Sequence, residues 1–137
     1  MTRHAIQTNG APAPVGPYSQ AIRSGDSVWC SGQVGLDPAT GELVEGGVEA
    51  QAERALRSLQ AVLDAAGLGF DDVVKTTIFL ADIGDFAAVN AVYARFMSDP
   101  PPARSTIGVG ALPKGALVEI EMVAQRIRTD AVSRTPA

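Results

Sequence analysis

Residues 100–124 read PPPARSTIGVGALPKGALVEIEMVA, and this stretch decides the fold expected of the chain. Its three prolines fix the backbone angle φ and favour an extended conformation in the residues that precede them. Two runs with apolar residues at alternate positions follow, and they predict two β-strands. Because successive side chains of a strand point to opposite faces, each run should have one core face and one free face.

Alternation along these two strands sorts their side chains by face. Arg104 and Thr106 of the first strand, with Glu119 and Glu121 of the second, are expected on the face that the core does not use. A guanidinium beside a carboxylate on that face would suit an anionic substrate and a polarised water. The alternative is an exposed strand edge with a surface ion pair, which adds little stability. The residues expected to line the core are Ile107, Val109, Val118, Ile120, Met122 and Ala124.

Composition narrows the class of protein. The chain has 137 residues, of which 46% are hydrophobic and 5% aromatic, so we expect one domain over residues 1–127 with an aliphatic core. The net charge is -4 and no basic run occurs, which argues against a nucleic acid partner. No apolar stretch is long enough to span a membrane, and no signal-peptide pattern is present. A cytoplasmic protein without a membrane partner is expected.

Cysteine and histidine content limits the chemistry further. Cys30 is the only cysteine, which excludes an intrachain disulfide and a cysteine-cluster metal site. It alternates with Trp29 on a predicted strand, so we expect a core thiol rather than a nucleophile. His4 is the only histidine and lies in the polar N-terminal segment. A histidine triad and a histidine metal site are therefore excluded.

The two ends of the chain and its strands follow from local patterns. Residues 1–16 are polar and proline-bearing and predict a loop, with residues 1–13 flexible. The segment 128–137 has no periodicity and is expected to be a disordered tail. Besides the two strands above, strands are expected at 18–23, 27–34 and 73–80.

Apolar residues at helical spacing predict two helices. The first has a stripe from Ala52 to Ala66 and ends at Gly67. The second runs from Phe86 to Met97, begins at an Asp82 or Asp85 cap, and ends before the prolines.

The resulting order, ββαβαββ, predicts an α+β fold. It is expected to be a two-layer sandwich in which two helices cover one face of a mixed sheet. The other face would be uncovered, and Leu117 and Val123 share it with the two glutamates. Self-association through that face is the simplest cover.

The chain resembles the reactive intermediate deaminase (Rid, or YjgF-type) family from about residue 13 to about residue 126. The motifs that carry the resemblance are GPYSQA at 16–21, SGQ at 31–33, VKTT at 74–77, FAAVN at 86–90, PARS at 102–105 and VEIE at 118–121. The resemblance implies a chorismate-mutase-like fold and a homotrimer with active sites in the clefts between subunits. It also implies hydrolysis of 2-imino and enamino acids to 2-oxo acids and ammonia, without a metal or an organic cofactor.

The resemblance also implies the two principal residues of the site. Arg104 matches the family's substrate-carboxylate arginine, a role that suits the planar fork of a guanidinium. Glu119 matches the glutamate that positions water toward the imine carbon. Glu121 lies on the same strand face, so the spacing alone does not choose between the two carboxylates.

Four further positions are implied as substrate-binding, each with a structural alternative. Tyr18 would reach into the cleft, or would be an aromatic at a subunit seam. Asn90 lies within the apolar stripe of the second helix, so its amide either contacts the ligand or braces the backbone. Ser31 and Gly32 would bring backbone close to the ligand, although a bulge at the strand end also explains the glycine.

Thr106 departs from the family's best-known members, which carry a cysteine at this position. Threonine keeps a small hydrogen-bonding side chain, and imine hydrolysis needs no thiol, so we expect Thr106 to contact substrate and the activity to remain. The competing hypothesis is a non-catalytic protein that binds 2-oxo or amino acids in the same cleft. An RNA-cleaving function, known for some relatives, is disfavoured by the acidic charge and the missing catalytic histidines. A chorismate mutase would follow from the fold alone, which does not assign chemistry.

Overall fold

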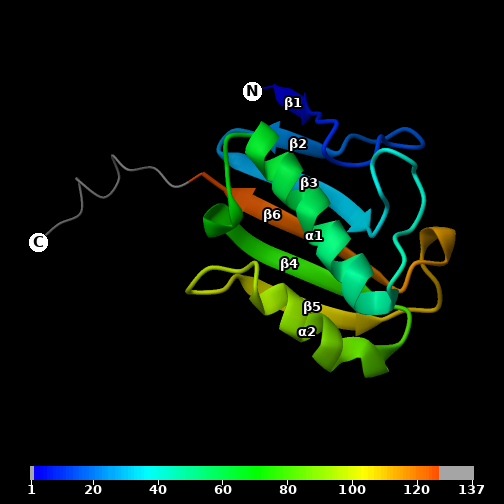
Figure 1. The fold of residues 1–137 in the computed structure, drawn as a ribbon. Helices are drawn as coiled ribbons and strands as arrows, with labels where there is room; N and C mark the ends of the chain where they lie inside the picture. Colours follow the sequence, from blue (N-terminus) through cyan, green and yellow to red (C-terminus); the bar gives the residue numbers. More distant parts are fainter. Residues whose placement is uncertain (1, 127–137) are drawn as a thin grey trace, which may run out of the picture.

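The computed structural model describes residues 2–126, which form one mixed six-stranded sheet with two α-helices on one of its faces (Figure 1). The predicted α+β sandwich is thus confirmed for this part of the chain. The strands are β1 (Arg3–Ile6), β2 (Ala21–Ser24), β3 (Ser27–Val34), β4 (Val73–Leu80), β5 (Ala103–Gly108) and β6 (Val118–Gln125), and the helices are α1 (Gly47–Ala65) and α2 (Phe86–Ala94).

The strands lie in the order β1-β2-β3-β6-β4-β5. Neighbours pair antiparallel except β4 and β5, which are parallel and joined through α2. The C-terminal strand β6 is therefore inserted between β3 and β4, where it joins the two halves of the chain. This insertion brings Glu119 next to Val34 of β3 and Phe79 of β4.

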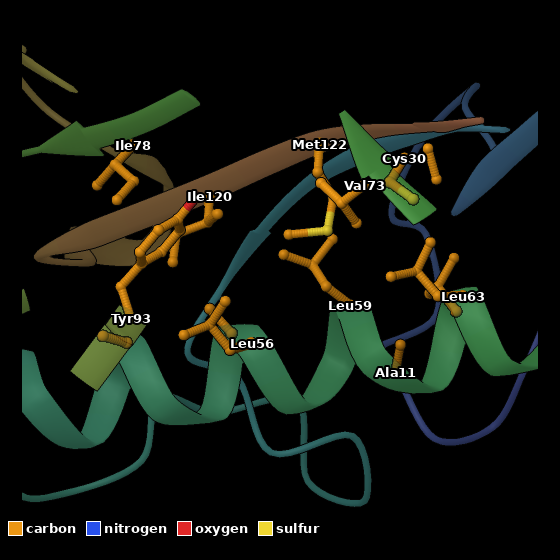
Figure 2. Close-up of a cluster of buried hydrophobic side chains, with 14 of the residues drawn as sticks. Ala11, Cys30, Leu56, Leu59, Leu63, Val73, Ile78, Tyr93, Ile120 and Met122 are labelled. Carbon is orange, nitrogen blue, oxygen red and sulfur yellow. The ribbon is translucent and has the colours of Figure 1, made fainter. Parts of the chain in front are cut away.

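Helix α1 follows its predicted stripe. Leu56, Leu59 and Leu63 are fully buried because their spacing places them on the turns that face the sheet. Figure 2 shows Leu56 and Leu59 pointing toward the sheet where Ile120 and Met122 of β6 lie, and Leu63 pointing toward Cys30. The helix ends at Ala65, and Gly67 follows with a φ of 76°, a left-handed conformation that favours glycine.

Helix α2 is shorter than its apolar stripe predicts. It ends at Ala94, and Phe96 and Met97 pack against the core from the irregular segment that follows. Asp82 caps the preceding 3₁₀ turn by accepting a hydrogen bond from the Gly84 amide, and Asp85 makes no side-chain cap. The helix therefore begins after a short turn and stops well before the prolines.

The N-terminal segment was predicted to be a loop, and that prediction is wrong for four of its residues. Residues 3–6 form the edge strand β1, paired with β2 from Arg3↔Ser24 to Ile6↔Ala21. Four residues carry little pattern, and their order comes from the backbone groups of β2 that they pair with. The strand at 18–23 begins later than predicted, at Ala21. The tail predicted at 128–137 lies outside the described residues.

The face assignment is right for β6 and wrong for β5. Val118, Ile120, Met122 and Ala124 are buried under the helices, as predicted. Ile107 is instead 45% exposed and Val109 is half-buried. The register explains the difference, because Ile107 pairs with Phe79, whose neighbour on β6 is Glu119 on the uncovered face.

Candidate functional site

The two principal candidates lie on opposite faces of the sheet. Arg104 pairs in register with Thr76, a residue that is fully buried beneath the helices, so the guanidinium lies on the helix side of edge strand β5. Glu119 pairs with Phe79 and lies on the uncovered side of β6. The expectation that both share the uncovered face is therefore wrong. The strand alternation had the wrong phase in β5, because the polar residues of this edge strand, and not its isoleucine, lie beneath α2.

Helix α2 surrounds Arg104 with one amide and two aromatic rings. Arg104 Nη1 donates a hydrogen bond to Asn90 Oδ1 at 2.7 Å. Its guanidinium carbon lies 5.5 Å from the ring centroid of Phe86 and 5.0 Å from that of Tyr93. These are cation–π distances, which stabilise a positive charge that is partly removed from water. Tyr93 is held in turn by a 2.6 Å hydrogen bond between its hydroxyl and that of Thr76.

Arg104 has no carboxylate partner within the described residues, whose salt bridges involve only Glu53, Arg57 and Arg95. The alternative of an edge strand with a surface ion pair is therefore not supported there. Pro101, Pro102 and Met97 complete an open hollow of about 910 Å³ in which Arg104 is the only charged group besides Asp99. A half-buried guanidinium with donors left free can take an anion.

Thr106 lies two residues further along the same side of β5. Its Oγ1 is buried and has no hydrogen-bond partner within the described chain. A buried hydroxyl without a partner is uncommon in folded proteins and usually marks a strained or functional position. Thr106 is therefore on the same side as Arg104 and presents a hydroxyl that can still form a hydrogen bond.

Glu119 lines a separate cavity of about 590 Å³ on the other side of the molecule. Tyr18, Ser31 and Gly32 line the same cavity, so four predicted site residues come together here. Burial, and secondarily the charge of Glu121, raise the pKa of the Glu119 carboxyl above its usual range. A carboxylate with a raised pKa is a better proton acceptor near neutral pH.

Gly32 makes room for the Glu119 carboxylate. A Cβ at this position would lie 2.1 Å from Glu119 Oε2 and 2.9 Å from its Cδ. The pairing of β3 with β6 also shifts between Cys30 and Gln33, so Gly32 sits in a bulge as well. The alternative of a bulge is therefore confirmed, and the close approach that the structure shows is to the glutamate side chain, so the predicted approach to a ligand stays a prediction.

Tyr18 and Ser31 shape the loop at the mouth of this cavity. The Ser31 hydroxyl donates to the Ser19 carbonyl at 2.6 Å, so it braces the loop. Tyr18 is 54% exposed, and its hydroxyl accepts a long 3.4 Å hydrogen bond from the Val15 amide. The exposed ring is free to contact either a ligand or another copy of the chain.

Glu119 and Glu121 differ in position although they share a strand face. Glu119 is half-buried and lines the cavity, whereas Glu121 is exposed and is absent from the cavity wall. Geometry thus favours the residue that the motif also favours.

Three residues of these two clusters were not predicted as site residues. Phe86 and Tyr93 appeared in the sequence only as members of the apolar stripe of α2, and their contact with Arg104 follows from β5 lying beneath that helix. Gln20, which lines the Glu119 cavity, is only 2% exposed. Its place within the GPYSQA motif was the one signal available.

The remaining chemistry-bearing residues are separate from both clusters. Cys30 is a buried core residue, and burial raises the pKa of its thiol to about 12, as expected of a structural cysteine. His4 lies on the exposed strand β1. Between residues 2 and 126, no group of three or more His, Cys, Asp or Glu side chains could hold a metal ion. None of the helices described there is long and apolar enough to cross a membrane.

Comparison with known proteins identifies the family of the chain. Residues 8–126 match the family described as Endoribonuclease L-PSP. The chain is 54% identical over 126 residues to Protein DfrA of Myxococcus xanthus, covering 90% of this chain and 96% of that protein. It is 50% identical over 124 residues to the 2-iminobutanoate/2-iminopropanoate deaminase of Mus musculus, covering 90% and 92%.

Solved structures give the same result. The fold matches RidA from an Antarctic Psychrobacter species with a TM-score of 0.86 and 48% identity, covering 89% of this chain and 98% of that one. It matches E. coli TdcF with bound serine with a TM-score of 0.85 and 39% identity, covering 90% and 99%. With the fold, the motifs and these relatives in agreement, the chain belongs to the Rid (YjgF) family, which the matching family model describes as Endoribonuclease L-PSP.

Proposed function

We propose that this protein is a hydrolytic deaminase that converts 2-imino and enamino acids to 2-oxo acids and ammonia. The observation that carries the proposal is the half-buried Arg104 guanidinium, which has no carboxylate partner between residues 2 and 126 and is oriented by Asn90 and two aromatic rings. Such a fork recognises a carboxylate with two parallel hydrogen bonds. Relatives named as deaminases of 2-imino acids and a relative with bound serine, which also carries a carboxylate, support the choice of ligand.

The complete site is formed between two copies of the chain. Arg104 and Glu119 lie on opposite faces of the sheet within one copy, so a small substrate cannot reach both there. The uncovered face also exposes Trp29, which is 57% accessible, next to Val123. Covering that face with a second copy would bury this apolar surface and could bring the Arg104 hollow of one copy to the Glu119 cavity of the next. The homotrimer implied by the resemblance is the assembly we propose.

The reaction requires the substrate and a water to be positioned, and it requires no covalent intermediate. Arg104 binds the substrate carboxylate and thereby orients the adjacent C=N carbon, while Glu119 holds a water against one face of that carbon. Water adds its oxygen to carbon and passes a proton to the Glu119 carboxylate, and the imine nitrogen takes up a proton from solvent to give a carbinolamine. The amine then takes the proton held by Glu119, the C–N bond breaks as the hydroxyl releases its proton to solvent, and ammonia leaves the 2-oxo acid. Well-oriented groups reach effective molarities of ~10⁵ M or more, which is ample for a reactive imine.

Removal of the guanidinium tests the carboxylate role. Arg104→Ala should lower accelerated 2-iminopropanoate decay by about 100-fold or more, because a charge-assisted contact to substrate is lost. The imine is generated by an amino acid oxidase and its decay is followed with catalytic amounts of protein. Arg95→Ala is the matched control, since Arg95 is an exposed arginine just after α2 whose one ion pair among residues 2–126 is with Glu53. Full activity in Arg104→Ala would reject the carboxylate assignment.

Mixing two inactive variants tests whether the site spans two copies. Arg104→Ala and Glu119→Gln are each expected to be inactive alone. If the two residues of one site come from different copies, a randomly mixed ring combines an intact Arg104 with an intact Glu119 at about one quarter of its sites. Unfolding and refolding the 1:1 mixture should therefore restore about one quarter of wild-type activity. A mixture that stays inactive while forming mixed oligomers would place both residues of a site in one chain.

A binding protein for small amino or 2-oxo acids is the second candidate, and the relative with bound serine favours it. The same imine assay separates the two, because a binder would be stabilised by ligand and would not accelerate decay. The name Endoribonuclease L-PSP raises a third activity. The net charge of -4 and the position of His4 on an exposed edge strand argue against RNA cleavage, and salt-sensitive RNA binding at neutral pH would revive it.

A further inference from the structure

The segment between β1 and β2 is ordered by its own set of contacts. We call residues 8–13 the strap. Ala11 is 3% exposed and packs into the core cluster that contains Leu63 of α1, as Figure 2 shows. Gly10 lies so close to α1 that a Cβ there would be 2.8 Å from Ala61 Cβ, and its carbonyl accepts a 3.3 Å hydrogen bond from Arg54. The strap thus packs against helix α1.

A single buried glutamine fastens the strap to β2. Gln20 Nε2 donates to the carbonyls of Thr8 at 3.0 Å, Ala11 at 3.3 Å and Pro12 at 2.9 Å. Gln20 Oε1 accepts from the Thr8 amide at 2.8 Å. The side chain is therefore fully satisfied by strap backbone, and no atom of it is left to bind a ligand. Its role in the cavity is to position what surrounds it.

The strap forms one wall of the Glu119 cavity. Pro12 and Ala13 line it, and Val15 continues the wall. Val34 and Leu36 stand among the other lining residues, so much of the lining is apolar. Lys114 and Gln33 also line the cavity, so its lining is mixed, and its apolar part is formed by the strap with Val15, Val34 and Leu36. An apolar wall beside Glu119 favours a substrate with an apolar side chain, while the substrate carboxylate binds Arg104 of the neighbouring copy in the assembly proposed above.

We propose that the strap is the side-chain selector of the site and that Gln20 is its positioning residue. The substrate class that fits is the 2-imino acids with branched apolar side chains, such as the imine of leucine, in preference to the imine of alanine. This inference rests on the proposed function for its reaction and on the strap and cavity for its selectivity. An isobutyl side chain can bury more apolar surface against such a wall than a methyl group can.

The test compares two substrates in three proteins. In Gln20→Met the side-chain volume is kept and all four strap hydrogen bonds are lost. In Ala13→Leu an exposed wall residue is enlarged, so the cavity is narrowed without a change in the core. For wild type we expect kcat/KM to be higher for the leucine imine than for the alanine imine. Since a single methylene in an apolar pocket changes selectivity by ~10–200-fold, the leucine/alanine ratio should fall by about tenfold or more in each variant.

Controls separate positioning from general damage. Ala39→Leu makes the same change at an exposed alanine that is not part of this cavity wall, and its ratio should match wild type. Thermal unfolding reports any loss of fold. A purely structural role of Gln20 would lower both substrates equally and leave the ratio unchanged, whereas a positioning role moves the ratio, mainly through KM of the leucine imine.

Binding of the 2-oxo acid products measures side-chain selectivity separately from turnover. Dissociation constants for pyruvate and 4-methyl-2-oxopentanoate are measured by NMR titration on the same proteins. If wild type shows no turnover, the proposed deaminase function fails, and the selector stands only if the branched oxo acid binds more tightly and loses that advantage in both variants. A wild type without a preference for the branched side chain, or a preference unchanged in Ala13→Leu, overturns the proposal.

Discussion

Gly32→Ala is the sharpest perturbation that the site offers. The new Cβ would lie 2.1 Å from Glu119 Oε2, which is roughly 1.4 Å inside an ordinary contact of ~3.5 Å. The φ of Gly32 is not in the left-handed region, so alanine is compatible with the backbone. The carboxylate is the end of a flexible side chain, and it is therefore the group that moves.

The expected result is a large loss of activity with a small loss of stability. A Glu119 carboxylate that is displaced by more than about 1 Å no longer holds water against the imine carbon. Misplacements of that size cost about 100-fold in rate. An off-rotamer glutamate costs about 0.5–1.5 kcal/mol of unfolding free energy. The assay is imine decay, with kcat and KM determined separately, and urea unfolding is measured beside it.

Gly69→Ala is the control for the glycine change itself. Gly69 has an extended backbone, nothing within 4 Å of an added Cβ, and no part in either cluster. We expect normal activity and slightly raised stability there, since alanine restricts the unfolded chain. Activity of Gly32→Ala within about threefold of wild type would show that the position of the Glu119 carboxylate does not control the rate, and the water-positioning role would have to be abandoned.

Three further predictions concern the same groups. Glu121→Gln should keep activity and move the acid limb of the pH–kcat/KM profile to lower pH, because the neighbouring charge helps to raise the pKa of Glu119; an unmoved limb would contradict this coupling. Glu119→Gln should raise thermal stability at pH 7, since a carboxyl with a raised folded-state pKa costs stability once it is ionised. That gain should vanish as pH falls below the ordinary carboxyl pKa, and a pH-independent gain would refute the linkage. Tyr93→Phe should lower unfolding free energy by about 1–3 kcal/mol, by leaving the buried Thr76 hydroxyl unpaired, and keep KM near wild type because the ring over Arg104 remains.

The sequence predicted the two-layer fold well because its strongest patterns are long. The apolar stripe of α1 and the alternation of β6 each run over eight or more residues, and both are buried as expected. The edge strands were predicted poorly. β1 has four residues and no pattern, and in β5 alternation could not tell which face α2 covers. In an edge strand that lies beneath a single helix, the contacts with that helix decide which side chains face it. Here the contacts are those of Arg104 with the Asn90 amide and two aromatic rings of α2.

The sequence predicted the residues of the site better than their arrangement, because the shared face predicted for Arg104 and Glu119 is wrong. The fold places four of the predicted residues around one cavity: Tyr18, Ser31, Gly32 and Glu119. It places Asn90 and Arg104 around a separate hollow. Gln20 was missed as a positioning residue, since its four bonds reach backbone 8 to 12 residues away and no periodicity records such contacts.

The separation of the two clusters bears on the assembly. The Arg104 hollow and the Glu119 cavity are different surfaces, so a contact that joins them is heterologous: one copy supplies the first and its neighbour the second. An open assembly with heterologous contacts has an unoccupied Arg104 hollow at one end and an unoccupied Glu119 cavity at the other. Closure into a ring removes both ends. In the trimer proposed above, a closed ring has as many complete sites as copies, and an isolated copy has none. Activity per chain should therefore fall with the fraction of closed rings on dilution, even though each copy retains every residue that the reaction needs.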